Sequence, residues 1–134
     1  MASVISKFAI AEIARGNIDY LNDTIKAVMV DSTTTFTPAI TEQNLSDIPS
    51  GDRIGDVATL GSKTISDTGI LDAADPIFLN VTGSLTQDLV VFYKDSGVEA
   101  TSTIIVSHDT SNLATDGNNV TYTLDANGVL ALAG

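Results

Sequence analysis

The chain contains a single histidine, His108, which is followed directly by Asp109. A histidine beside a carboxylate can act as a general base when the carboxylate orients the imidazole and a nucleophile lies within reach. The neighbouring serines, Ser107 and Ser111, do not occur in the Gly-x-Ser-x-Gly turn that presents the nucleophile of many hydrolases. We therefore expect His108 to lie at the end of a strand, on a solvent-exposed edge, without a catalytic role.

Oxygen-rich segments could hold a cation. Residues 72–75 (Asp-Ala-Ala-Asp) and 116–119 (Asp-Gly-Asn-Asn) offer suitable ligands, but neither follows the twelve-residue calcium loop with its terminal bidentate glutamate. Most aspartates of the chain stand beside Gly, Asn or Ser, where an aspartate side chain caps turns. One histidine and no cysteine leave almost no way to build an ordinary zinc site. We expect no metal site.

Other motifs of enzymes are missing as well. Gly61 is the only glycine followed two residues later by lysine, and it lacks the earlier glycine of a phosphate-binding loop. The absence of cysteine excludes a thiolate nucleophile and a disulfide framework. Four asparagines match glycosylation sequons, but the N-terminus does not resemble a secretion signal, so we discount them: Asn22, Asn44, Asn80 and Asn119. By elimination we expect a protein that is not an enzyme, with no catalytic and no cofactor-binding residues.

The chain is strongly acidic, because 17 Asp and Glu residues against 6 Lys and Arg residues give a net charge of −11. An acidic chain repels phosphate backbones and its few basic residues are scattered, so nucleic-acid binding is not expected. We attribute the acidity to solubility, with cation binding or a basic partner surface as the alternatives. No apolar run approaches the roughly 20 residues that span a bilayer, so we expect a protein made in the cytoplasm and soluble there, without contact to a membrane.

The elements that would position these residues are mostly strands. Residues 89–93 and 101–106 form two nearly continuous apolar runs, separated by Lys-Asp-Ser-Gly at residues 94–97. Their β-branched and aromatic side chains predict an antiparallel hairpin with its turn at that break. Because the runs are continuous rather than alternating, we expect both strands to be covered on both faces, as in the middle of a sandwich or a closed barrel.

A helix is predicted for residues 3–14, with Ser3 as its N-cap and Gly16 as its stop signal. One face of this helix would carry apolar side chains at helical spacing: Val4, Ile5, Phe8, Ala9 and Ile13. Two interpretations stay open. The helix packs on the side of the β core, or it is an arm that docks on a neighbouring subunit.

The rest of the chain shows short β segments separated at regular intervals by turn residues. Residues 24–30 predict a strand, Pro38 marks an edge, and residues 39–52 predict a long loop with one helical turn at 42–45. Further strands are predicted at residues 53–60, 63–66, 69–71 and 77–81, and a closing hairpin is predicted between residues 120–124 and 129–132, with a polar connection over residues 108–119.

These patterns predict a mainly β protein of 134 residues, an antiparallel β-sandwich or a small jelly-roll-like barrel with a short N-terminal helix. We expect an N-terminal helix or arm over residues 1–16 and a single antiparallel β domain over residues 17–134. Only 17% of the residues are charged, which favours burial of part of the surface in an oligomer.

Two stretches resemble a group of small virion proteins of tailed bacteriophages. Residues 16–30 read Gly-Asn-Ile-Asp-Tyr-Leu-Asn-Asp-Thr-Ile-Lys-Ala-Val-Met-Val, similar to the short helix and following Ile-Asp-Leu…Asp-Thr-Ile-Lys-Val strand that open those proteins. Residues 91–105 contain Val-Phe-Tyr-Lys-Asp-Ser-Gly and Ala-Thr-Ser-Thr-Ile-Ile, similar to the group's Tyr-Lys-Asp-Thr-Gly…Thr-Ser-Pro-Leu-Ile segment. The chain departs from the group at the threonine-rich residues 33–37 and at residues 42–55.

The resemblance implies a structural virion protein without enzymatic activity, and within that class we expect a head decoration (cement) protein. Such proteins are β-rich, commonly homotrimeric, and bridge neighbouring subunits of the major capsid protein on the capsid exterior. The contacts would come from the N-terminal arm and from the loop that begins at residue 38: Val4, Ile5, Phe8, Pro38, Ile40, Leu45, Ile48 and Ile54.

Three alternatives remain at this point. A phage tail or head-tail connector component belongs to the same broad class. A carbohydrate-binding β-sandwich module belongs to another, but aromatic residues make up only 5% of the chain and tryptophan is absent. A hydrolase would require a pocket that holds His108 together with two acidic side chains.

Overall fold

The strands form one five-stranded antiparallel sheet and two smaller sheets. A computed structural model describes residues 3–31, 34–81, 86–114 and 119–132. The five-stranded sheet has the order β1-β8-β7-β2-β3, the three-stranded sheet β10-β5-β4, and the third sheet pairs β6 with β9. In chain order the helix and the strands are β1 (Ser3–Ile5), α1 (Lys7–Ala14), β2 (Ile25–Asp31), β3 (Arg53–Thr59), β4 (Thr64–Ile65), β5 (Ile70–Asp72), β6 (Ile77–Phe78), β7 (Thr86–Lys94), β8 (Ile104–Ala114), β9 (Val120–Thr121) and β10 (Leu130–Ala131).

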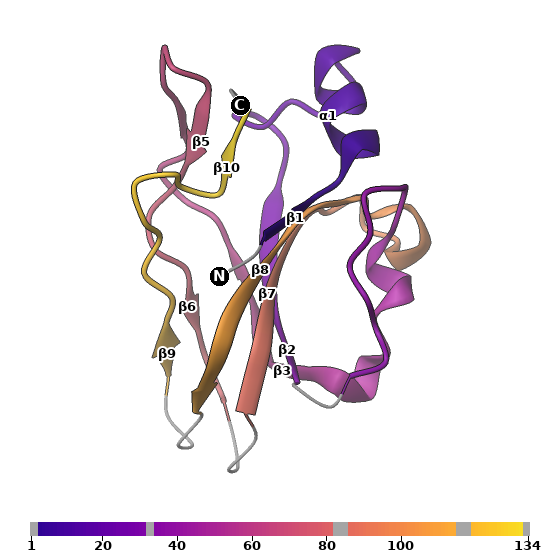
Figure 1. Ribbon diagram of the computed structural model, residues 1–134, viewed down its shortest axis with the longest axis vertical. Helices are drawn as coiled ribbons and strands as arrows, with labels where there is room; N and C mark the ends of the chain where they lie inside the picture. Colours follow the sequence, from indigo (N-terminus) through magenta and orange to yellow (C-terminus); the bar gives the residue numbers. More distant parts are fainter. Residues whose placement is uncertain (1–2, 32–33, 82–85, 115–118, 133–134) are drawn as a thin grey trace.

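The five-stranded sheet is covered on both faces. The small strands β5, β6, β9 and β10 lie on one side of it, and residues 34–52 with their two 3-10 turns, Leu45–Asp47 and Ser50–Asp52, lie on the other (Figure 1). This arrangement confirms a mainly β, sandwich-like protein with one short helix near its N-terminus.

Strand β2 shows the double coverage in its alternation. Ile25, Ala27 and Met29 belong to a large apolar cluster shared with the small strands, whereas Val28 and Val30 belong to a second cluster on the opposite face. That second cluster also contains three side chains from outside the sheet: Phe36, Leu45 and Ile48. A strand apolar on both sides needs both layers, because either exposed face would leave large aliphatic side chains in water.

The predicted central hairpin is confirmed in its pairing, but its connection is longer than the predicted break at residues 94–97: it spans residues 95–103 and contains a 3-10 turn at Glu99–Thr101, so the second strand begins at Ile104. Strands β7 and β8 pair antiparallel, with Phe92 opposite Val106 and Tyr93 opposite Ile104. One residue, Ile105, is therefore extra on β8, and its side chain joins the large cluster together with Val106. This bulge lets β8 place two successive apolar side chains into the same core.

The N-terminus differs from the prediction, because the helix begins four residues later than expected. Residues 3–5 form strand β1, which pairs with β8 from Ser3 opposite His108 onwards. The N-cap is Ser6, whose hydroxyl accepts a hydrogen bond of 3.0 Å from the Ala9 amide. The β-branched pair before Ser6 favours a strand once β8 offers a partner, which the local pattern could not reveal. The stop is as predicted, since Gly16 follows the helix with φ +83°.

The predicted closing hairpin is wrong. Strand β9 pairs with β6 and strand β10 pairs with β5, so the two last strands do not pair with each other. The turn between them contains Gly128 with a positive φ of +60°, as expected, but it carries the chain from one small sheet to the other. The polar connection expected from residue 108 is wrong as well, because β8 continues to residue 114.

The remaining strands lie close to their predicted positions. Strands β2 and β3 agree with the predicted residues 24–30 and 53–60 to within one residue at each end. Strands β4, β5 and β6 lie within or beside their predicted segments and are only two or three residues long. The helical turn expected at residues 42–45 lies slightly later, at Leu45–Asp47.

The two layers are joined directly along β3. The Asp56 amide donates a hydrogen bond of 2.9 Å to the Leu79 carbonyl oxygen, just beyond β6. Gly55 makes this approach possible, since it has φ +68° and a Cβ atom there would lie 2.9 Å from the Leu79 oxygen and 2.9 Å from a methyl carbon of Val81. The sandwich is therefore closed at its β3 side.

We predict that Gly55→Ala lowers the free energy of unfolding by about 1–3 kcal/mol, because the new methyl group strains the backbone and collides with residue 79. Gly61→Ala is the matched control, since no heavy atom lies within 4 Å of the added methyl group, and it should change stability little. Urea unfolding followed by circular dichroism measures both. Equal losses in the two variants would contradict the proposed closure at β3.

Candidate functional site

The two segments predicted to contact a partner meet at one edge of the five-stranded sheet. Strand β1 covers the outer side of β8, and next to it the Ile104 amide donates to the Gln43 carbonyl oxygen at 2.9 Å. The Lys7 amide, at the start of α1, donates to the Ile40 carbonyl oxygen at 2.8 Å. The N-terminal segment and the loop of residues 37–45 therefore complete the same sheet edge.

The predicted contact residues divide into two sets. Four are half-buried and Ile40 is 50% exposed, so these five remain accessible: Val4, Ile5, Phe8, Pro38 and Ile40. The other three are buried: Leu45 (7% exposed), Ile48 (0%) and Ile54 (2%). For these three the prediction of a contact is wrong, because their side chains fill the apolar clusters of the protein itself and no partner can reach them in this fold. We call Val4, Phe8, Pro38 and Ile40 the edge surface.

Arg53 holds the loop behind this surface. Its guanidinium donates to the Ile48 carbonyl oxygen at 2.7 Å and to the Leu45 carbonyl oxygen at 3.0 Å, and it forms a two-pronged pair with Glu99 at 2.9 and 3.0 Å. The Arg53 side chain is only 16% exposed. The hydrogen bonds and the positive charge of Arg53 lower the pKa of the Glu99 carboxyl. Sequence reasoning missed this clamp, because nothing local links two residues that are 46 positions apart.

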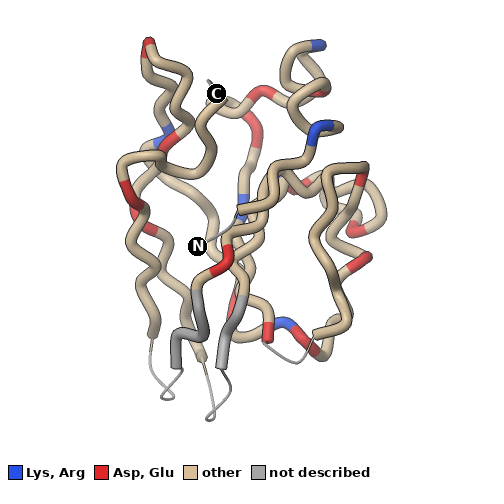
Figure 2. Tube along the Cα trace, viewed as in Figure 1, with Lys and Arg blue, Asp and Glu red and all other residues tan. Residues whose placement is uncertain are grey.

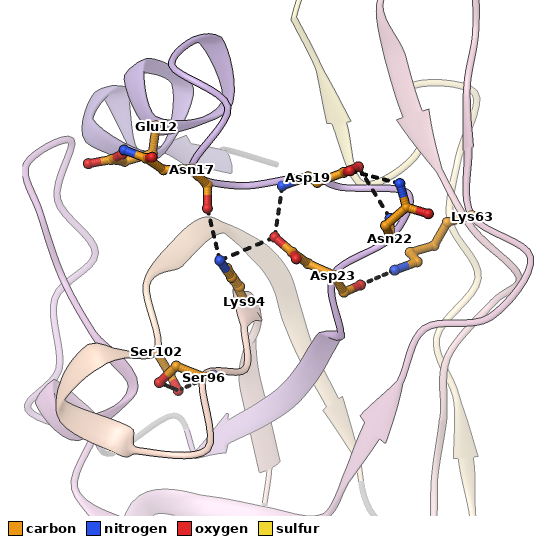
Figure 3. A network of polar contacts seen from close by, with 9 residues as sticks. All are labelled: Glu12, Asn17, Asp19, Asn22, Asp23, Lys63, Lys94, Ser96 and Ser102. Carbon is orange, nitrogen blue, oxygen red and sulfur yellow. Dashed lines mark hydrogen bonds and ion pairs between the residues drawn. The ribbon is translucent and has the colours of Figure 1, made fainter.

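A second polar network ties α1 to the sheet (Figure 3). The Asp23 carboxylate accepts from the Asp19 amide at 2.8 Å and pairs with the Lys94 ammonium at 3.2 Å. Lys94 also donates to the Asn17 carbonyl oxygen at 2.8 Å, and Lys63 donates to the Asp23 carbonyl oxygen. Each acidic group in this network already has donors from the chain, so the network orders the segment between α1 and β2.

Of the acidic segments considered as cation sites, the described one, residues 72–75, runs from the end of β5, and its carboxylates accept hydrogen bonds from backbone amides. Asp72 accepts from the Ala73 amide at 2.8 Å, and Asp75 accepts from the Leu124 amide at 2.9 Å. Residues 116–118 of the other segment lie outside the described residues. In the described part of the chain, no group of three or more His, Cys, Asp or Glu side chains is arranged to hold a metal ion.

His108 is buried within β8, so the predicted position on a solvated edge is wrong. Its side chain is 8% exposed, and its ring lies 4.9 Å from the Phe92 ring. Nε2 lies 2.8 Å from the Val129 carbonyl oxygen and Nδ1 lies 2.8 Å from the Tyr122 hydroxyl. Because a carbonyl only accepts, we assign the proton to Nε2, and the Tyr122 hydroxyl then donates to Nδ1. The imidazole thus fastens the C-terminal segment to the main sheet.

Burial determines the charge state of this pair. It lowers the pKa of His108, against the opposing effects of the Val129 carbonyl and the nearby Asp125 charge. Burial also raises the pKa of Tyr122. Both groups are therefore neutral near pH 7, which suits a hydrogen bond between an imidazole and a hydroxyl in an apolar setting.

A pocket of about 580 Å³ lies beside His108, between β1 and β8 on one side and residues 122–131 on the other. Asp125 is the only acidic side chain among the described residues that line it. Asp109 and Ser107 alternate with His108 along β8 and so face the opposite side of the sheet. The side chain of Ser111 lies outside the described part of the structure. The pocket therefore presents one acid rather than the two that a hydrolase was expected to need.

We predict that Arg53→Lys lowers the free energy of unfolding by about 1–3 kcal/mol, because lysine cannot serve the Leu45 and Ile48 carbonyl groups and Glu99 together. Glu99→Gln is the matched control, since it removes only the exposed partner and should lower stability less. Urea unfolding compares the two variants. A loss in Glu99→Gln as large as in Arg53→Lys would assign the clamp to the ion pair instead.

We predict that stability falls as the pH drops below about 6.5. The lowered pKa of His108 means that the unfolded chain binds a proton more readily than the folded one. This contribution is fully present above pH 6.5 and is lost as the pH falls towards the folded-state pKa. His108→Gln should lack this part of the pH dependence in urea unfolding, whereas an unchanged slope would exclude His108 as its origin. Asp19, Asp95 and Glu99 have lowered pKa values and act only at more acidic pH.

Two comparisons with known proteins were without a match. No family model matches the chain, and no curated protein matches it. Among the described residues, no helix has the length and apolar character to cross a membrane. The functional inference therefore depends on the residues and on the geometry described above.

Proposed function

We propose that this protein is a non-enzymatic structural component of a bacteriophage virion, which decorates the outside of the capsid and cements it by bridging neighbouring major capsid subunits. The observation that carries the proposal is the edge surface. Two segments far apart in the sequence are joined there by the Lys7–Ile40 hydrogen bond, and both present apolar side chains that the fold leaves accessible. The resemblance of residues 16–30 and 91–105 to small phage virion proteins gives the class.

The charge distribution suits an outer position. Figure 2 shows acidic residues over much of the molecule and few basic ones among them. With a net charge of −11, the protein does not compete with the shell for packaged DNA. A protein that binds the assembled shell and not its separate subunits stabilises the shell by mass action. We propose that it does so as a homotrimer on the capsid exterior, after synthesis in the host cytoplasm.

The edge surface has the composition of a contact site. Ile40 is 50% exposed although isoleucine is among the residue types most often buried. Phe8 and Pro38 are half-buried, and a partly accessible aromatic side chain is a common anchor of protein interfaces. A tail or head-tail connector component would use the same surface, so its place in the virion distinguishes the two.

The carbohydrate-binding alternative has less support. Sugar rings stack on accessible aromatic side chains, and the chain has only 7 aromatic residues, 4 Phe and 3 Tyr. Five of them are buried: Tyr20, Phe36, Phe78, Phe92 and Tyr93. Phe8 and Tyr122 are half-buried, and Tyr122 is bonded to His108. None of the seven aromatic residues is fully exposed, which leaves a sugar ring little to stack on.

We predict that tagged protein added to capsids that lack it labels the whole head in electron micrographs. Ile40→Asp should weaken capsid binding at least about tenfold, because the interface would then bury an unpaired carboxylate. Ile65→Asp is the matched control, since Ile65 on β4 is similarly exposed (45%) and lies outside the edge surface, and it should bind like the wild type.

Other outcomes would redirect the proposal. Label confined to the tail or the neck would contradict a cement role and favour the connector alternative. Label on neither part would favour the carbohydrate-binding alternative. Equal loss of binding in Ile40→Asp and Ile65→Asp would show that the edge surface is not the contact site.

A further inference from the structure

The sandwich is closed on one side and open on the other. At β3 the two layers are joined by the hydrogen bond between Asp56 and Leu79. At the opposite side, β1 ends the five-stranded sheet and β10 ends the three-stranded sheet, and no other described strand pairs with the outer side of either (Figure 1). The pocket beside His108 lies between these two edges, with Ser3 and Ile5 on one wall and Leu130 on the other.

The outer edge of β1 presents backbone groups that can pair with another strand. The Ser6 amide donates to the Ile105 carbonyl oxygen at 3.0 Å, so by the alternation of an antiparallel ladder Val4 is the next residue bonded to β8. The N–H and C=O groups of Ser3 and Ile5 therefore point away from β8. Proteins protect such an edge by keeping it short or with a charge, a proline or a bulge; β1 is only three residues long, but it contains no charge, proline or bulge.

The pocket next to this edge has a defined chemistry. Ile5, Val106 and Leu130 give it an apolar wall, and its volume of about 580 Å³ lies within the usual range for a binding pocket. Asp125 and His108 are the ionisable groups of its lining besides Tyr122, and no lysine or arginine is among them. The pocket therefore favours an apolar side chain that has a positive charge beside it.

We propose that β1 and this pocket form a slot for an extended segment of a partner protein, which pairs with the outer edge of β1, places an apolar side chain in the pocket and directs a neighbouring Lys or Arg towards Asp125. Strand addition of this kind takes affinity from the backbone and specificity from alternate side chains. A second copy of this chain suits the slot poorly, because the chain has only 6 Lys and Arg residues against 17 Asp and Glu residues and so offers few extended segments with a positive charge beside an apolar side chain. The slot shares β1 with the edge surface, but by the alternation of the strand the side chain of Val4 faces the opposite side from those of Ser3 and Ile5, so the slot does not depend on the capsid proposal.

The test uses isotope-labelled full-length protein and an acetylated seven-residue peptide of alternating valine and lysine. We expect saturable binding below about 1 mM, with the amide signals of Ser3, Ile5 and Asp125 shifted and the amides of Ser3 and Ile5 exchanging more slowly with solvent. The same peptide with glutamate in place of lysine should bind at least about tenfold more weakly. Absence of saturation at about 1 mM, or shifts confined to other residues, would overturn the proposal.

Two variants and one control test the backbone pairing and the charge separately. Ser3→Pro removes an N–H group that points outwards and leaves the hydrogen bonds to β8 in place. It should therefore lower the affinity for the peptide at least about tenfold. Ser3→Ala keeps that N–H group and should bind like the wild type. Asp125→Asn should abolish the preference for lysine over glutamate without changing the fold. Unchanged binding in Ser3→Pro and an unchanged preference in Asp125→Asn would overturn the proposal, whatever the capsid experiment shows.

Discussion

The constraint that organises this protein is that its three central strands are apolar on both faces. Strands β2, β7 and β8 cannot be left half-covered, because each face carries large aliphatic or aromatic side chains. The small strands supply one cover. The other cover is a segment with little regular structure, and such a segment must still satisfy its own backbone groups when it is buried.

Arg53 resolves that difficulty, and the solution shapes the surface. Its guanidinium serves the carbonyl groups of the buried loop, while Leu45 and Ile48 fill the second cluster. The loop is thereby anchored along residues 45–53, and its earlier part passes over the rim of the sheet to meet the helix at the Lys7–Ile40 bond. The accessible apolar side chains of the edge surface are thus a by-product of how the second face is covered.

The sequence predicted the features that depend on local composition. The central hairpin, the strands β2 and β3 and the stop at Gly16 follow from apolar runs and turn residues that need no distant partner. The predictions that were wrong concern features that depend on distant pairing. Residues 3–5 form a strand only because β8 is beside them, and β9 and β10 pair with strands about 44 and 59 residues earlier in the chain. His108 and three of the predicted contact residues were misplaced for the same reason, because burial is decided by what covers a side chain.

The pairing of β1 with β8 also has a consequence for biosynthesis. Ser3 lies opposite His108, and His108 is in turn bonded to residues 122 and 129, so β1 cannot complete these contacts until more than 120 further residues have been synthesised. Contacts of such long sequence separation form slowly. While the ribosome is still adding residues, the apolar N-terminal segment has no place to dock and is available to chaperones or to other nascent chains. The pairing of β1 therefore follows the synthesis of the residues that support β8.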